Sequence, residues 1–254
     1  MLKFIGTGSA FNTELGNTSA YIKQDKTLFV IDTGATTFAR AKEISLFEEI
    51  ENVYIIITHM HTDHVGSLGN FIEYLTIFKN VTPNIVLTND EKTAEQQEKN
   101  IKEYLAKVGV LEEDYEFTYA DMMEEVLHDL LKIELVEVQH SKKLVSHAVE
   151  LVFKDCTVYY TGDQNDLAYL KKIAKKLTPN DLVYTDCTVR DYKGRIHVTL
   201  DELEEIFTPE QKEQITCMHF DSYTTYSEAK SRGFKVASRE VSKEELLRQI
   251  ANRK

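Results

Sequence analysis

The chain has 254 residues, of which 42% are hydrophobic and 28% are charged, and its formal net charge is −12 at pH 7. This composition is typical of a globular protein rather than a disordered one, and the acidic balance disfavours a broad contact with a nucleic-acid backbone. No apolar stretch approaches the roughly 18 residues of a membrane span and the start has no signal-peptide layout, so we expect a cytoplasmic protein without a membrane partner.

The first half of the chain predicts strands and helices in alternation. Apolar and β-branched runs predict strands at residues 2–5, 19–23, 28–31, 53–57 and 85–87. The run 53–57 is continuous, as in a buried central strand. Helical spacing predicts helices at residues 38–50, 65–78 and 90–108. The acidic stretch 111–131 is ambiguous, and we expect a helix near residues 122–127.

In the second half, an alternating pattern over residues 132–160 predicts three antiparallel strands. Further strands are expected at 182–185, 215–218 and 234–237, and helices at 166–176, 199–207, 224–232 and 242–250. Repeats and Gly/Ser linkers are absent from the sequence. This pattern predicts one α/β domain over residues 1–254, with two sheets between helices. The three cysteines are widely spaced and odd in number, which predicts free thiols.

Residues 59–64 read His-Met-His-Thr-Asp-His and follow the predicted central strand directly. His59 and His61 are two positions apart, so they point to the same side of an extended segment. Asp63 and His64 follow where the chain turns into the next helix, so they can face a second ion. Three imidazoles and a carboxylate at the end of a buried strand need partners, which divalent cations supply. The run therefore predicts a metal-dependent hydrolase with a two-metal site.

Six residues in one loop cannot complete two coordination spheres, so further ligands are expected at other strand ends. His140, Asp163 and His219 each follow a predicted strand and are the candidates. His147 remains an alternative to His140, or a contact to a substrate phosphate.

These motifs together resemble the metallo-β-lactamase superfamily over nearly the whole chain. The resemblance includes the Gly-Thr-Gly-Ser opening at 6–9, Asp-Thr-Gly at 32–34 and Thr-Gly-Asp at 161–163. It implies an αββα four-layer sandwich. The ligands that it implies for the first metal are His59, His61 and His140, and those for the second are Asp63, His64 and His219. Asp163 would bridge the two metals, which are usually zinc, with manganese as an alternative.

Within the superfamily, the chain resembles the tRNase Z-like phosphodiesterase branch. The opening at 4–10 is similar, and Asp186-Cys187-Thr188 precedes His197-Val198-Thr199 as in that branch's acid-x-Thr and His-Ser-Thr pair. The resemblance implies that His197 protonates the leaving oxygen and Asp186 fixes its tautomer, while Asp63 orients or deprotonates the attacking water. The chain departs from the branch at Asp186 (usually Glu), at Val198 (usually Ser) and at 220–224. It also lacks a long Gly- and basic-rich insertion that grips tRNA.

Compact members of this branch include the phage-type anti-Pycsar proteins, which open cyclic nucleotide signals, and the chain resembles that group. The resemblance implies a phosphodiesterase of a small cyclic mononucleotide, commonly a homodimer, with an anti-defence role in the host cytoplasm if the chain is phage-encoded. The alternatives are a tRNA 3′-processing endonuclease or other RNA nuclease, and a protein that only sequesters a nucleotide. Thioester or lactam hydrolysis is a lesser alternative. Tyr192 and Arg195 are candidate substrate contacts.

Overall fold

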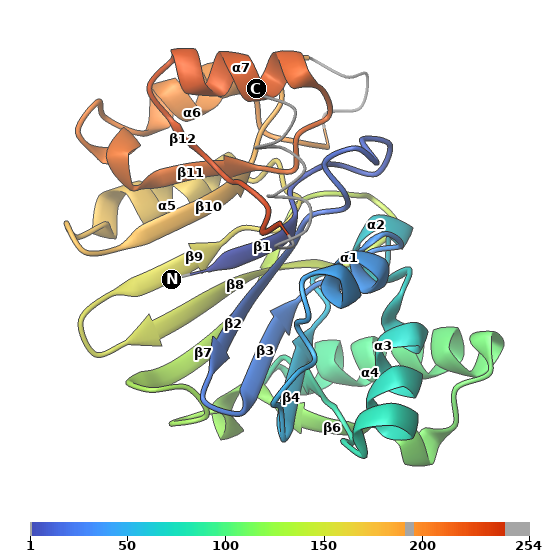
Figure 1. Ribbon diagram of the computed structural model, residues 1–254. Helices are drawn as coiled ribbons and strands as arrows, with labels where there is room; N and C mark the ends of the chain where they lie inside the picture. Colours follow the sequence, from blue (N-terminus) through green and yellow to red (C-terminus); the bar gives the residue numbers. More distant parts are fainter. Residues whose placement is uncertain (1, 191–195, 242–254) are drawn as a thin grey trace.

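Two six-stranded β-sheets pack face to face, and helices cover their outer faces (Figure 1). The structure is a computed structural model, and it describes residues 2–190 and 196–241. The four layers confirm the αββα arrangement that the resemblance implied.

The first sheet has the strand order β1-β2-β3-β4-β5-β6. Its strands are β1 (Lys3–Gly6), β2 (Ser19–Gln24), β3 (Thr27–Ile31), β4 (Asn52–Ile56), β5 (Asn84–Leu87) and β6 (Glu116–Tyr119). The first three strands are antiparallel, and β3 to β6 are parallel. Because β3 and β4 run in register, with Ile31 opposite Ile56, the loops that follow them emerge at the same edge.

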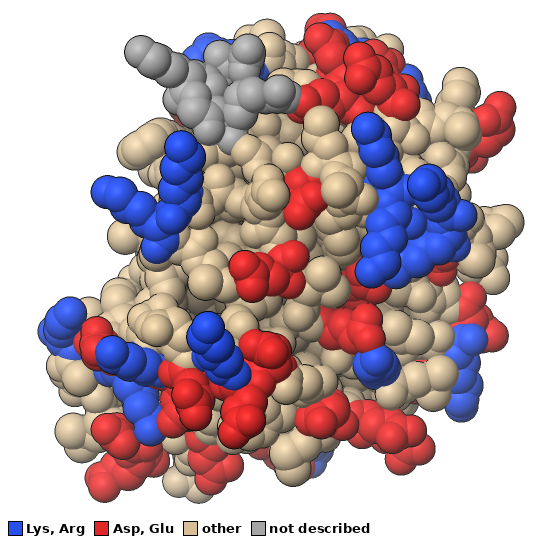
Figure 2. All heavy atoms as spheres, turned by 180° about the vertical axis from the view of Figure 1, so that it is seen from behind, with Lys and Arg blue, Asp and Glu red and all other residues tan. Residues whose placement is uncertain are grey.

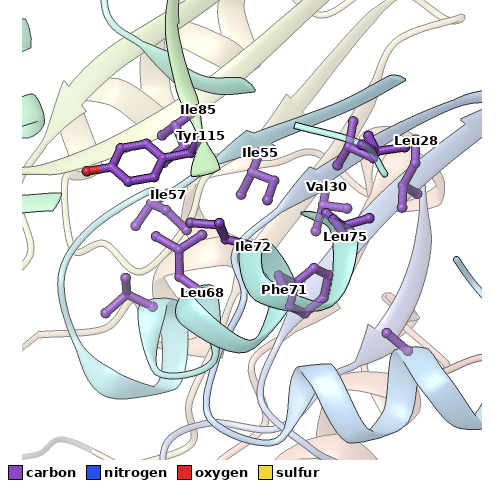
Figure 3. Close-up of a cluster of buried hydrophobic side chains, with 14 of the residues drawn as sticks. Leu28, Val30, Ile55, Ile57, Leu68, Phe71, Ile72, Leu75, Ile85 and Tyr115 are labelled. Atoms are coloured by element: carbon purple, nitrogen blue, oxygen red, sulfur yellow. The ribbon is translucent and has the colours of Figure 1, made fainter. Parts of the chain in front are cut away.

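The helices on this side are α1 (Thr37–Glu43), α2 (Thr62–Val65), α3 (Leu68–Tyr74), the π-helical turn η1 (Leu75–Lys79) and α4 (Glu91–Val108), with short 3₁₀ turns η2 (Glu112–Asp114) and η3 (Ala120–Met122). Their apolar side chains pack on the first sheet, as Figure 3 shows for Phe71 and Ile72 of α3 against Val30 and Ile55 of the strands. This core anchors the strand that precedes His59.

The second sheet has the order β12-β11-β10-β9-β8-β7. Its strands are β7 (Leu130–Val138), β8 (Ser146–Phe153), β9 (Thr157–Tyr160), β10 (Leu182–Asp186), β11 (Ile215–Met218) and β12 (Lys235–Val236). The strands β7 to β9 form the predicted antiparallel meander, and β9 to β12 are parallel. The outer helices are α5 (Leu167–Lys176), α6 (Leu200–Ile206) and α7 (Tyr223–Ser231), with the 3₁₀ turn η4 (Gln211–Gln214).

Three predicted segments differ from the structure. The helix expected near residues 122–127 is wrong, because Glu125 and Asp129 have positive φ and the chain turns there while Met123 and Leu127 reach the core between the sheets. The helix predicted at 65–78 is divided between α2, α3 and η1. The one predicted at 38–50 ends at Glu43, with positive φ at Ser45 and Glu49.

Strand β6 was not predicted within the acidic stretch. The helix expected at 242–250, with its capping box, lies outside the described residues. All three cysteines are free, as predicted. In the described part of the chain, no helix has the length and apolar character that crossing a membrane requires.

Candidate metal centre

The predicted metal ligands follow the carboxyl ends of strands in both sheets. His59, His61, Asp63 and His64 come after β4, while His140, Asp163 and His219 come after β7, β9 and β11. In the second sheet these three strands share one direction, because β7 and β9 are both antiparallel to β8, and β9, β10 and β11 are parallel. Their carboxyl ends therefore deliver polar side chains to one edge, where the two sheets meet.

The structure gathers all seven predicted ligands into two groups. His59, His61 and His140 form one, and Asp63, His64, Asp163 and His219 form the other. Within each group the donor atoms lie within 4.8 Å of one another. The first group has the residues implied for the first metal, and the second has those implied for the second metal together with Asp163.

Asp163 belongs to the second group and also approaches the first. Its Oδ2 is 3.2 Å from His219 Nε2 and 3.3 Å from His64 Nε2, both in the second group. The same oxygen is 3.9 Å from His140 Nε2 in the first group. This position suits a carboxylate that contacts two cations.

The hydrogen bonds around the cluster leave the inward-facing nitrogens available as ligands. His140 Nδ1 donates to the carbonyl oxygen of Ile196 at 2.8 Å, which leaves Nε2 unprotonated and directed toward His61 Nδ1 at 3.3 Å. His59 Nε2 lies 2.8 Å from the same His61 nitrogen. Such outer hydrogen bonds to metal-ligating imidazoles set the tautomer and the ring orientation.

Burial and charge also fit a cation here. Burial lowers the pKa of His59, of His61 and of His140, the last to about 4, so these rings are neutral and can coordinate. Burial alone would lower the pKa of His64, but Asp163 and Asp32 raise it well above its usual value. His64 Nε2 and Asp163 Oδ1 are buried with no hydrogen-bond partner among the described residues. A metal ion would supply both the missing partner and the positive charge that the carboxylates favour.

Asp32 is a functional residue to which the sequence analysis gave no role. It follows β3, is fully buried and has φ of +66°. His64 Nδ1 donates to its Oδ2 at 2.8 Å, and the Thr58 hydroxyl donates to the same carboxylate. That hydroxyl in turn accepts from His59 Nδ1 at 3.1 Å. Asp32 therefore orients one histidine in each group, and its place in the Asp-Thr-Gly motif after a strand was the available signal.

His197 and Asp186 form a pair beside the cluster. Nδ1 of His197 donates to Asp186 Oδ2 at 2.8 Å, which leaves Nε2 as the second ring position. Burial lowers the pKa of His197, but the hydrogen bond to Asp186 and the charges of Asp163 and Asp186 outweigh it and raise the value to about 9. The ring lies 5.1 Å from that of His219 and 5.4 Å from that of His140, between centroids.

His197 also lies close enough to His140 and Asp163 to form a third group of donors within 4.8 Å. The position of His197 therefore suits either a proton donor or a further metal ligand. Removing the ring should lower the metal content only if His197 is a ligand.

His147 does not take the place of His140. It is buried, its Nδ1 accepts a hydrogen bond from Gln97, and it belongs to none of the donor groups in the described residues. Tyr192 and Arg195 lie outside those residues.

Comparison with known proteins shows the family. The family model of the anti-Pycsar protein Apyc1 matches residues 1–241. The anti-Pycsar protein Apyc1 of Paenibacillus xerothermodurans is 28% identical over 231 residues, which cover 87% of this chain and 87% of that protein. That of Bacillus phage vB_BveM-Goe7 is 27% identical over 239 residues, covering 86% and 88%.

Two solved structures show the fold. The metallo-β-lactamase fold protein YhfI from Bacillus subtilis superposes with a TM-score of 0.67 at 14% identity, over 95% of this chain and 96% of that chain. The short form of human tRNase Z superposes with a TM-score of 0.63 at 15% identity, over 94% and 96%. The chain has the metallo-β-lactamase fold, and it is an enzyme that belongs to the anti-Pycsar protein Apyc1 family.

Proposed function

We propose that the protein is a two-metal phosphodiesterase that hydrolyses a small cyclic phosphodiester, a cyclic mononucleotide signal. The observation that carries the proposal is the buried cluster of seven donors with the His197–Asp186 pair beside it. The cluster supports hydrolysis at a phosphate, and the pair supports protonation of an oxygen leaving group.

Seven residues would bind the two metal ions. His59, His61 and His140 would hold one ion, Asp63, His64 and His219 the other, and Asp163 would contact both. Imidazole and carboxylate ligands suit zinc, and manganese would also fit. When bound, the two ions would supply Lewis-acid chemistry, lowering the pKa of water and neutralising charge on the phosphoryl oxygens.

The remaining steps fall to three side chains. Asp63 would orient the water that attacks phosphorus, since its Oδ2 lies inside the cluster, 3.3 Å from His219 Nε2. As the bond from phosphorus to the ribose oxygen breaks, Nε2 of His197 would donate a proton to that oxygen. Asp186 would hold the proton on Nδ1, so that Nε2 faces the leaving group.

The test is a substrate panel assayed with added zinc or manganese. It contains cyclic mononucleotides, linear phosphodiesters and precursor tRNA. We expect turnover of at least one cyclic mononucleotide, and its loss in His61→Ala but not in His128→Ala. His128 is the matched control, because it is exposed and pairs with Asp25 at 2.9 Å outside the cluster. Binding of cyclic nucleotides without turnover would instead support a sequestering protein.

RNA cleavage is the second candidate because the fold is shared with human tRNase Z. The charge of −12 opposes a long contact with RNA phosphates. On the face shown in Figure 2, Lys and Arg side chains form separate groups, with neutral and acidic residues between them. Cleavage of precursor tRNA alone in the panel would overturn our first choice.

Cytoplasmic location and a homodimer are parts of the same proposal. Sedimentation of the purified protein would give a mass near twice that of the 29.3 kDa chain if it is a dimer.

A further inference from the structure

A groove of about 550 Å³ lies beside the metal centre, between α4 and the second sheet. Residues 57–60, after β4, line one part of it, and side chains between Lys92 and Ile101 of α4 line another. Glu137 of β7 and Val145, just before β8, complete the lining. His59 belongs both to this lining and to the first group of metal-ligand candidates. The groove is therefore adjacent to the centre, and its volume is that of a small-molecule site.

Two side-chain amides of α4 offer unused hydrogen-bonding groups to this groove. Nε2 of Gln96 donates to Oδ1 of Asn100 at 2.8 Å, one helical turn away. The bond leaves Oε1 of Gln96 and Nδ2 of Asn100 without partners among the described residues. The pair therefore presents one acceptor and one donor side by side.

The amide of Gln97, which also lines the groove, already has hydrogen-bond partners within the protein. Its Oε1 accepts from the backbone N–H of Thr88 at 3.0 Å, and its Nε2 donates to His147 Nδ1 at 3.2 Å. This arrangement gives His147 a structural role, since it ties α4 to β8. The two hydrogen bonds also hold α4 in place, so the positions of Gln96 and Asn100 on this helix are fixed.

The rest of the lining favours a flat, uncharged group. The lining includes four apolar residues, Ile57, Met60, Ile101 and Val145. The exposed apolar surface comes mainly from Met60 and Val145, because Ile57 and Ile101 are buried. The charges of the lining residues sum to about zero, because Lys92 and Lys99 are matched in number by Glu95 and Glu137. A phosphate would find no net positive charge here, whereas an aromatic heterocycle would find apolar contact along its faces and hydrogen bonds at its edge.

We propose that the groove binds the nucleobase of the substrate, with Gln96 and Asn100 contacting the base edge while the cyclic phosphate lies at the metal centre. The proposal rests on the proposed function. Nucleobases carry a hydrogen-bond donor and an acceptor at neighbouring edge positions, which is the complement of this amide pair. Gln96 and Asn100 are therefore specificity-determining residues.

The first experiment compares Gln96→Ala and Asn100→Ala with wild type on cyclic mononucleotides and on bis(p-nitrophenyl) phosphate, a phosphodiester without a base. We expect each variant to lose about fivefold in kcat/KM on the preferred cyclic nucleotide, mainly through KM, as for one lost hydrogen bond. The loss should be smaller on the substrate without a base. Glu103→Ala, on the same helix but outside the groove, is the matched control and should behave as wild type.

The second experiment measures base preference directly. Asn100→Asp replaces an amide donor with an acceptor, so the ratio of kcat/KM values should shift toward the bases with exocyclic amino donors, adenine, cytosine and guanine, and away from uracil. A structural defect would lower the rates for all four bases equally. Equal losses for all bases, or equal losses on bis(p-nitrophenyl) phosphate, would overturn the proposal.

A third measurement separates this proposal from the proposed function. Binding of free nucleosides, followed by ligand-observed NMR, needs no phosphate and no turnover. Nucleoside binding that weakens in Asn100→Ala but not in Glu103→Ala would support the groove even if no cyclic nucleotide is hydrolysed. Hydrolysis of cyclic nucleotides with nucleoside binding unchanged in Asn100→Ala would overturn the groove and leave the proposed function intact.

Discussion

Replacing Asp32 with asparagine tests how far the metal centre depends on a residue that would not itself touch a metal. Its carboxylate accepts from the backbone N–H of Thr58 at 2.8 Å, from the Thr58 hydroxyl and from His64 Nδ1. Asparagine tolerates positive φ and fills nearly the same volume, so the backbone should be retained. Its amide nitrogen, however, cannot accept a hydrogen bond. Either His64 or Thr58 then loses its acceptor, and the negative charge that favours a cation is removed.

Loss of such an outer hydrogen-bond partner typically weakens metal binding by about 10- to 100-fold, which corresponds to about 1.4–2.7 kcal/mol. We expect Asp32→Asn to weaken zinc binding by that factor in competition with a chelator, and activity to return at higher zinc. Asp181→Asn is the matched control. Asp181 is also a buried carboxylate, and it accepts from the backbone N–H groups of Thr157 and Thr178 without contacting the cluster. Equal zinc affinity in the two variants would refute the reasoning.

Three further predictions concern the general acid, a close contact and the core. His197→Ala should keep its metal content and lose about 10²–10⁴-fold in kcat, whereas loss of metal would make His197 a ligand. Gly34→Ala would place a Cβ against the backbone oxygen of Asp63, so it should lower both the melting temperature and the metal content. Gly69→Ala, which meets only valine methyl groups at 3.1 and 3.3 Å, should be tolerated, and equal effects of the two changes would argue against the contact. Phe71→Ala should cost about 3–5 kcal/mol in denaturant unfolding, because its buried ring packs edge-on against Phe47 at 5.1 Å; a loss below about 1 kcal/mol would contradict that role.

Much of the fold could be predicted because hydrophobic periodicity is a local property. The strand before His59 and the meander from β7 to β9 both have clear patterns, and both are confirmed. The segment around Met123 and Leu127 was misread, since two apolar residues four apart suggest a helix. There the buried side chains are satisfied by the core between the sheets, with left-handed turns at Glu125 and Asp129. The packing of these side chains between the sheets, and not their spacing along the chain, therefore determines the local backbone conformation.

Some residues of the candidate site could likewise be predicted from the sequence, and others could not. His59 to His64 are contiguous, so their chemistry could be read directly, and the strand-end rule found His140, Asp163 and His219. Asp32 also follows a strand, in the Asp-Thr-Gly motif, but its role depends on its contacts with Thr58 and His64, which only the structure shows.

The sequence by itself determined the elements and the donor types, because periodicity and coordination chemistry belong to residues and their near neighbours. It therefore pointed to a metal-dependent hydrolase, while the resemblance to the tRNase Z-like branch implied that His197 is a proton donor. Only the tertiary structure brought the donors of distant strands into one cluster, showed which nitrogen of His140 faces inward, and placed α4 with Glu137 and Val145 around a groove beside His59. These features depend on strands and helices far apart in sequence, whose approach is set by packing between the layers.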